Sequence, residues 1–267
     1  MLRESEPLVV EVIEAVRRGD GASVRRLLDT KPGLAGEYIE CADGSARTLL
    51  HMVTDWPGFL PNGPAVARML IDAGADPDAR TVGGAFAETP LHWAASSDDA
   101  DVAEALIAGG ANVEMPDGSI GTPLDNAIGY GCWNVARVLV NRGARVDKLW
   151  HAAALGKYDR LIGLLDESPP SEEALTEAFF QACSGGQRRA AELLLTRGVD
   201  INAAPGYGSS PLEAAAALGT QRQQLVEWLR EHGAQPRGGS LNRVPVRFLA
   251  VGQSGGGCPG EVALGVL

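Results

Sequence analysis

The sequence predicts an all-α solenoid made of stacked helix–turn–helix units. The first observation is a recurring Thr-Pro-Leu segment, which begins at Thr89 and again at Thr122, a step of 33 residues. Self-similarity at this period is typical of repeats that bury their apolar faces only against their neighbours. The second observation is that each unit opens on a residue that can cap a helix, and the third is that it closes on a glycine. We therefore expect one array to account for most of the 267 residues.

The start of each predicted unit carries the signals of a helix N-terminus. The side-chain oxygen of the capping residue can accept a hydrogen bond from a free backbone N–H of the first turn. Proline follows three of the caps, at a position where its missing N–H costs nothing. The pair Ala94-Ala95 and its counterparts are small, which allows neighbouring inner helices to approach closely. The predicted caps are Thr48, Thr89, Thr122, Asp147 and Ser210.

The second helix of each predicted unit is leucine-rich and ends at a glycine. The segment Leu106-Ile107, followed by Gly109-Gly110, is an example. Glycine adopts the left-handed conformation that ends many helices without a steric penalty. The predicted terminating glycines are Gly74, Gly110, Gly143, Gly198 and Gly233.

The segments 89–95 and 122–127, with the glycine-ended helices behind them, closely resemble the ankyrin repeat. The resemblance implies an inner helix, an outer helix and a projecting hairpin or loop in each unit. It also implies a concave face, formed by the hairpins and the inner helices, through which such proteins bind other proteins. In the inner helices it implies that His51 and His92 bridge the capping threonine and the adjoining turn.

The predicted organisation has three parts. Residues 5–35 form a degenerate N-terminal cap unit, and residues 1–235 as a whole form the repeat array. Residues 236–267 are rich in Gly and Pro and are predicted to form a flexible tail. The predicted repeats begin near residues 48, 89, 122, 147, 177 and 210.

The spacing between repeat starts departs from its period at three places. Forty-one residues separate Thr48 from Thr89, with the added length in two loops rich in Gly and Pro. The two steps after Thr122 are 25 and 30 residues and lack room for a hairpin. An opening is therefore predicted above Trp150 and His151. Simple decay of the repeat is the alternative interpretation.

The composition restricts the classes of function. A formal net charge of −11 argues against a surface for nucleic acid, which requires clustered Lys and Arg. No apolar run reaches the ~18 residues of a membrane-spanning helix, so a cytoplasmic protein with no membrane partner is expected. The four cysteines lack metal-ligand spacing, and neither a metal nor a cofactor is predicted. The Ala- and Gly-rich, lysine-poor composition is typical of a high-GC bacterial genome.

The resemblance implies which residues line the concave face. They are the two residues after each small pair and the residue before the capping threonine, together with nearby aromatic side chains. Aromatic residues beside acidic ones are favourable anchors for a protein partner, and an acidic face favours a basic one. Packing of Trp56 onto its own unit is the alternative for that residue. The predicted binding residues of this expected monomer are Asp55, Trp56, Glu88, Trp93, Ser97, Asp98, Asn126, Tyr130, Trp133 and Trp150.

The leading hypothesis is therefore a protein-binding scaffold or adaptor. The alternative is a small-molecule or catalytic pocket in the middle repeats, where tryptophan, histidine and carboxylate side chains recur on the inner helices. Acid–base or metal-assisted chemistry there would use His92, Asp125 and His151. Since most ankyrin repeats are binding scaffolds, the resemblance favours the first hypothesis.

Overall fold

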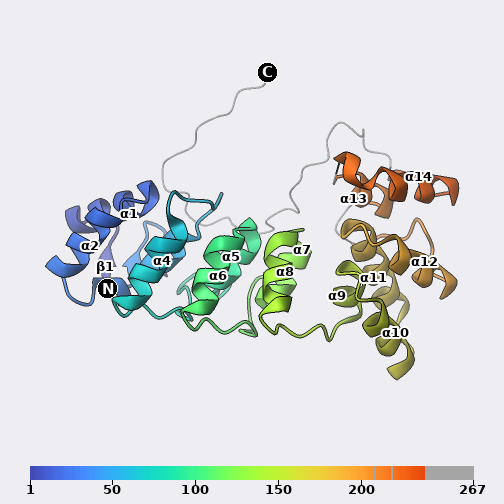
Figure 1. Ribbon diagram of the computed structural model, residues 1–267, viewed down its shortest axis with the longest axis horizontal. Coiled ribbons are helices and arrows are strands. Elements are labelled where there is room, and N and C mark those ends of the chain that lie inside the picture. The colour runs from blue at the N-terminus through green and yellow to red at the C-terminus, as the bar shows by residue number, and fades with distance from the viewer. Residues whose placement is uncertain (207–208, 218, 238–267) are drawn as a thin grey trace, which may run out of the picture. The chain divides into compact units, whose positions relative to one another are not determined.

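The computed structural model describes residues 1–206, 209–217 and 219–237, and these are predominantly helical (Figure 1). The described residues fall into two compact units. Unit 1 comprises Met1–Ala127 and Asn134–Arg142, and unit 2 comprises Ile128–Trp133 and the described residues from Gly143 onward. The predicted tail lies almost entirely outside the described residues. No described helix combines the length and the apolar character that crossing a membrane requires.

Unit 1 consists of successive helix pairs, each an inner helix followed by an outer one (Figure 1). The first pair corresponds to the predicted N-terminal cap unit. The helices are α1 (Pro7–Arg18), α2 (Gly21–Thr30), α3 (Leu49–Val53), α4 (Gly63–Asp72), α5 (Pro90–Ser97), α6 (Ala100–Ala108), α7 (Pro123–Gly129) and α8 (Trp133–Asn141). The last two residues of α7 and the first residue of α8 count with unit 2.

A small three-stranded sheet accompanies the first two helix pairs of unit 1. Strand β1 (Leu2–Arg3) runs parallel to β2 (Ile39–Glu40), which pairs antiparallel with β3 (Ala46–Arg47). A bridge between Ala46 and Val82 extends the pairing to the next loop along the chain. A short 3-10 helix, Leu34–Gly36, precedes the sheet. Strands β2 and β3 form a hairpin that precedes α3, and β1 adds a third strand from the N-terminus.

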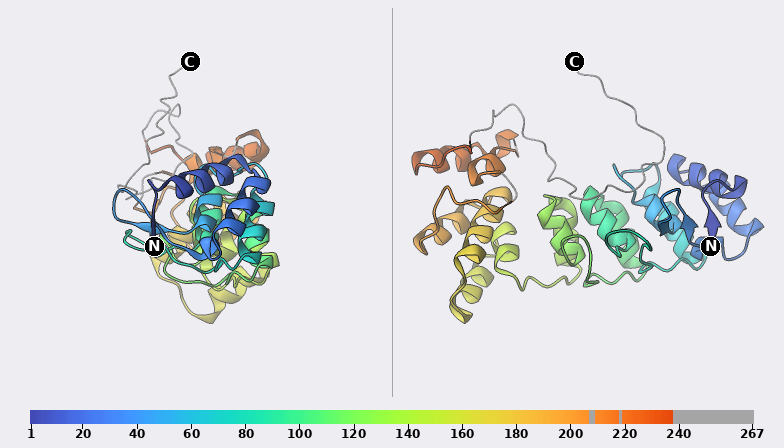
Figure 2. Two further views of the ribbon diagram at one scale, coloured as in Figure 1. Left: turned by 90° about the vertical axis from the view of Figure 1, so that its left-hand side faces the viewer. Right: turned by 180° about the vertical axis from the view of Figure 1, so that it is seen from behind.

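Unit 2 has the same alternation of inner and outer helices (Figure 2). Its core includes Phe179 and Leu194, which are fully buried. The elements are α9 (Leu149–Ala154), α10 (Tyr158–Glu167), α11 (Glu172–Ser184), α12 (Arg188–Thr196), α13 (Pro211–Ala216), a 3-10 helix (Gly219–Arg222) and α14 (Gln223–Glu231). Stacked helix–turn–helix units, the predicted fold class, are confirmed.

Most of the predicted helix ends agree with the structure, and two differ. All five predicted terminating glycines have positive φ. Asp147 is not a cap, because α9 starts one residue later with Lys148 at the cap position. Helix α11 starts at Glu172 rather than near residue 177. The cause is Ser171, whose hydroxyl accepts a hydrogen bond from the N–H of Ala174 at 3.2 Å and so starts the helix early.

Candidate functional site

Two buried histidines join the inner helices α3 and α5 to the loop that precedes the next inner helix. The N–H of Thr48 donates to Nδ1 of His51 at 3.2 Å, and Nε2 of His51 donates to the carbonyl of Glu88 at 3.1 Å. His92 repeats the arrangement with Thr89 and with the carbonyl of Gly121, at 3.2 and 3.1 Å. Both ring nitrogens are therefore used within the fold. This is the bridging role that the resemblance implied for these residues.

Burial disfavours the charged form of both imidazoles. It lowers the pKa of His51 to about 4 from an ordinary value of 6.5, and the nearby Arg47 adds to the effect. The pKa of His92 is also lowered, first of all by burial. Because Nδ1 accepts a hydrogen bond in each case, the neutral ring is the form that this geometry requires.

The lowered pKa of His51 predicts that stability falls in mild acid. Between its folded pKa of about 4 and its unfolded value of 6.5, the unfolded chain binds a proton that the folded chain excludes. The contribution of the neutral His51 ring to the free energy of unfolding is fully present above pH 6.5 and is lost as the pH falls toward 4, by roughly 3 kcal/mol in all. Urea unfolding at pH 7.5 and about pH 5, above most carboxylate titration, measures this loss. Equal free energies of unfolding at the two pH values would contradict the prediction, and His51→Gln should reduce the dependence.

A buried carboxylate and a buried amide hold the loop before α7. One oxygen of Glu88, Oε1, accepts hydrogen bonds from the N–H of Ser119 at 2.8 Å and from Nδ2 of Asn126 at 2.9 Å. The amide oxygen of Asn126 accepts from the N–H of Ile120 at 3.1 Å. Glu88 and Asn126 are 8% and 0% exposed, so they position this loop instead of lining a binding face as predicted.

Three loops project from unit 1 on the side of these contacts, and we call them the finger loops: residues 41–45, 81–88 and 114–121. The bridge between Ala46 and Val82 ties the first to the second. The second and third are tied by Glu88, as described above. They expose three large apolar side chains, Val82 at 50%, Phe86 at 43% and Ile120 at 43%. These three residues are not among the predicted binding residues, although isolated apolar residues within Gly-rich loops are a usable signal.

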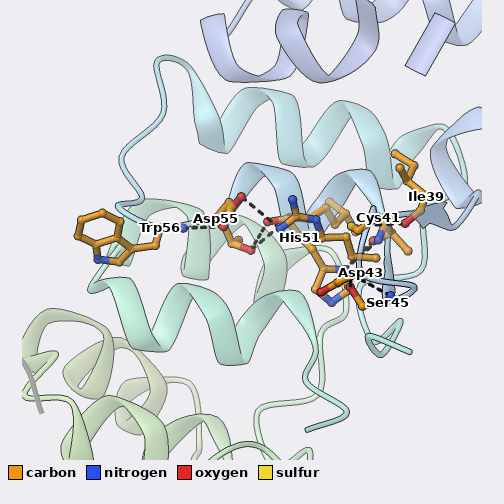
Figure 3. Close-up of polar contacts among 11 residues, drawn as sticks. Ile39, Cys41, Asp43, Ser45, His51, Asp55 and Trp56 are labelled. Carbon is orange, nitrogen blue, oxygen red and sulfur yellow. Dashed lines mark hydrogen bonds and ion pairs between the residues drawn. The ribbon is translucent and has the colours of Figure 1, made fainter. Parts of the chain in front are cut away.

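An ion pair lies beside the inner helices α3 and α5 (Figure 3). Nη1 of Arg47 is 3.3 Å from Oδ2 of Asp55, and the guanidinium lies 5.7 Å from the ring centre of Trp93. Trp93 also meets His51 edge to face, with ring centres 5.1 Å apart. The structure thus brings together Asp55 and Trp93, two of the predicted binding residues, around Arg47, which was not predicted.

Other predicted residues in unit 1 serve the helix turns. Asp98 has a φ of 59° and accepts hydrogen bonds from the N–H groups of Asn134 and Val135 at 2.8 and 3.0 Å, which caps α8. The hydroxyl of Ser97 donates to the carbonyl of Trp93 at 3.1 Å. Trp56 lies in the α3–α4 loop and is 66% exposed. It lies at the opposite end of α3 from the first finger loop (Figure 3).

The remaining predicted residues belong to unit 2. Tyr130 and Trp133 are half-buried. Trp150 is half-buried and meets the ring of His151 edge to face at 4.3 Å, while His151 is 1% exposed and lies 3.9 Å from Asp147. The pocket predicted from Trp93, Asn126, Trp150 and His151 stays a prediction.

The residues proposed for catalysis have structural partners. Oδ2 of Asp125 accepts from the N–H and the hydroxyl of Thr122 at 2.7 and 3.0 Å, and Asp125 is fully buried. His92 uses both ring nitrogens, as described. Among the residues that the structure describes, no cluster of His, Cys, Asp and Glu is arranged to hold a metal ion. The geometry supports the positioning of loops by these side chains and gives no support to acid–base chemistry.

Comparison with known proteins identifies the repeat. A family model described as ankyrin repeats (3 copies) matches residues 50–148. The glycerophosphocholine phosphodiesterase gde1 of Schizosaccharomyces pombe is 31% identical over 115 residues, which are 43% of this chain and 10% of that protein. Human ankyrin repeat and SOCS box protein 16 is 40% identical over 72 residues, which are 27% of this chain and 15% of that protein. The chain thus spans a small fraction of the length of these relatives.

Solved structures of ankyrin repeat domains are also similar to this chain. The ankyrin repeat domain of Bcl-3 has a TM-score of 0.45 and 24% identity, covering 84% of this chain and 86% of that one. The human ASB11 ankyrin repeat domain has a TM-score of 0.39 and 25% identity, covering 71% of each chain. The family match shows that residues 50–148, with their stacked helix pairs, are ankyrin repeats.

Proposed function

We propose that this protein is a binding scaffold that recognises a partner protein through the finger loops and inner helices of unit 1. The observation that carries the proposal is the exposure of Val82, Phe86 and Ile120 on consecutive finger loops. Apolar side chains exposed together on a fixed frame are characteristic of interaction sites. Repeat arrays present such extended surfaces because each unit adds the same face to its neighbour's.

The frame behind these side chains supports the proposal. Hydrogen bonds from His51, His92, Glu88 and Asn126 fix the loops before any partner arrives. A surface that is already ordered loses less conformational entropy on binding, and this raises affinity. The structural use of His92 and Asp125 weighs against the small-molecule or catalytic alternative, which we do not propose.

The proposal extends to the kind of partner and the setting. A net charge of −11 favours a basic partner and disfavours self-association, so we propose a monomer when free. The described cysteines, Cys41, Cys132 and Cys183, form no disulfide with one another. Free thiols are usual in a reducing compartment, which supports a cytoplasmic location.

Truncating two finger side chains tests the proposal. The double variant Phe86→Ala with Ile120→Ala is expected to lose a specific protein partner in affinity capture from cells of the source organism. The reason is that these anchors supply the apolar contact area at the centre of the proposed interface. Partner affinity should fall at least about tenfold when the captured protein is purified and titrated.

The control is Val10→Ala, which removes an apolar side chain that is 41% exposed on α1 and is not part of a finger loop. It should keep every partner, and thermal unfolding of both variants should match the wild type. Retention of all partners by the double variant would refute binding through the finger loops.

A further inference from the structure

A second exposed apolar feature lies outside the finger loops. We call residues 55–62, which connect α3 to α4, the aromatic loop. Its two aromatic side chains, Trp56 and Phe59, are 66% and 67% exposed. Trp56 and the first finger loop lie at opposite ends of α3 (Figure 3). The aromatic loop and the finger loops are therefore separate exposed features of unit 1.

The backbone of the aromatic loop is fixed by its neighbours. The N–H of Phe59 donates to Oδ2 of Asp99 at 2.7 Å, and Nδ2 of Asn62 donates to the carbonyl of Gly19 at 3.0 Å. The N–H of Trp56 donates to Oδ1 of Asp55 at 3.0 Å. These hydrogen bonds connect the loop to the repeat before it and to the repeat after it. The two rings are thus exposed on an ordered support, which reduces the entropy lost when they bind.

Gly58 keeps the loop close to the next repeat. It has a φ of 78°, a conformation that favours glycine, and it is buried. A Cβ atom there would lie 3.0 Å from the Cβ of Ser97 at the end of α5. This close approach places the aromatic loop against the turn between α5 and α6.

That turn is acidic. Asp98 and Asp99 lie between the two helices, and Asp101 is exposed in the first turn of α6. Asp99 contacts the aromatic loop directly through the N–H of Phe59. Arg47 is only 14% exposed and pairs with Asp55, the carboxylate of the aromatic loop itself. Asp99 is 2% exposed and caps α6, and Asp98 caps α8, so the exposed carboxylate of this turn is that of Asp101. Together with the net charge of −11, it favours a cationic partner for the exposed rings.

We propose that the aromatic loop docks an arginine-bearing basic segment of a partner protein, with guanidinium groups stacked on Trp56 and Phe59. Planar guanidinium groups stack on aromatic faces and are more weakly hydrated than ammonium groups. The protein uses the same contact internally, with Arg47 over Trp93 at 5.7 Å and Arg188 over Trp228 at 5.5 Å. The docking surface is distinct from the finger loops, so it goes beyond the function proposed above and does not depend on it.

The test compares two cationic probes on the full chain. Fluorescently labelled oligo-arginine and oligo-lysine peptides of equal length are titrated with the protein at physiological salt. If only the negative charge of the protein attracted them, the two peptides would bind with equal affinity, whereas stacking on the rings gives oligo-arginine the higher affinity. The wild type is expected to bind oligo-arginine about fivefold more tightly than oligo-lysine.

Two double variants separate the surfaces. Trp56→Ala with Phe59→Ala leaves every charge in place and should abolish the preference for arginine while weak lysine binding remains. Val82→Ala with Phe86→Ala removes apolar groups from the finger loops and should keep the full preference. The second variant changes the finger loops and leaves the aromatic loop intact. The arginine preference would therefore remain even if the finger loops proved to bind no partner protein.

Three results would overturn the proposal. The first is equal affinity of the wild type for the two peptides, and the second is an arginine preference that survives loss of both rings. The third is equally tight binding of a neutral, apolar peptide of the same length, which would show that the rings act without the neighbouring carboxylates.

Discussion

Replacing Phe179 with alanine is expected to lower the free energy of unfolding by about 3–5 kcal/mol. Phe179 lies on the inner helix α11, is 0% exposed, and packs in a core that includes Ala153, Leu161 and Leu194. The substitution removes the apolar contact of a whole ring and leaves a cavity that the surrounding helices fill only in part. Urea unfolding followed by circular dichroism measures the change.

The matched control is the same substitution at the surface. Phe86 is 43% exposed on a finger loop, so Phe86→Ala should cost less than about 1 kcal/mol. A similar loss at both positions, or a loss below about 1 kcal/mol at Phe179, would contradict the described packing of α11.

Replacing Asn126 with leucine is expected to cost about 3 kcal/mol. The change leaves the buried carboxylate of Glu88 with one donor fewer and leaves the N–H of Ile120 without its acceptor. Buried polar groups without partners are expensive because water cannot reach them. Urea unfolding at neutral pH gives the loss.

Asn134→Leu is the control for this second prediction. Asn134 is exposed at the start of α8, and its backbone N–H keeps its bond to Asp98 after the substitution. It should cost less than about 1 kcal/mol. If Asn126→Leu proved as mild as Asn134→Leu, the network around Glu88 would not support the loop before α7.

Local rules explain how much of the fold the sequence predicts. Thr89 with its following proline and Gly110 behind the outer helix are signals within one repeat, and the structure uses both as expected. Helix α11 starts at Glu172, and not near residue 177 as predicted, because the local cap at Ser171 begins the helix there. A cap beside the helix outweighs a period measured from elsewhere in the chain.

The roles of site residues were harder to predict because they depend on contacts between repeats. Glu88 and Asn126 were predicted to be binding residues, yet they form a hydrogen bond with each other across 38 positions of the chain, and both are buried. Asp98 was expected to contact a partner and instead caps α8. A polar residue at a given repeat position has the same sequence signal whether it faces a partner or the next repeat.

The central claim is that buried hydrogen bonds hold the finger loops in place before a partner binds. Native-state hydrogen exchange of the Ser119 and Ile120 amides tests it most directly, because both donate to the buried pair Glu88 and Asn126. The account predicts that these two amides are protected in the free wild-type protein and that Asn126→Leu removes the protection while the core of α11 stays protected. Exchange of both amides at the rate of an unstructured peptide in the wild type would contradict it.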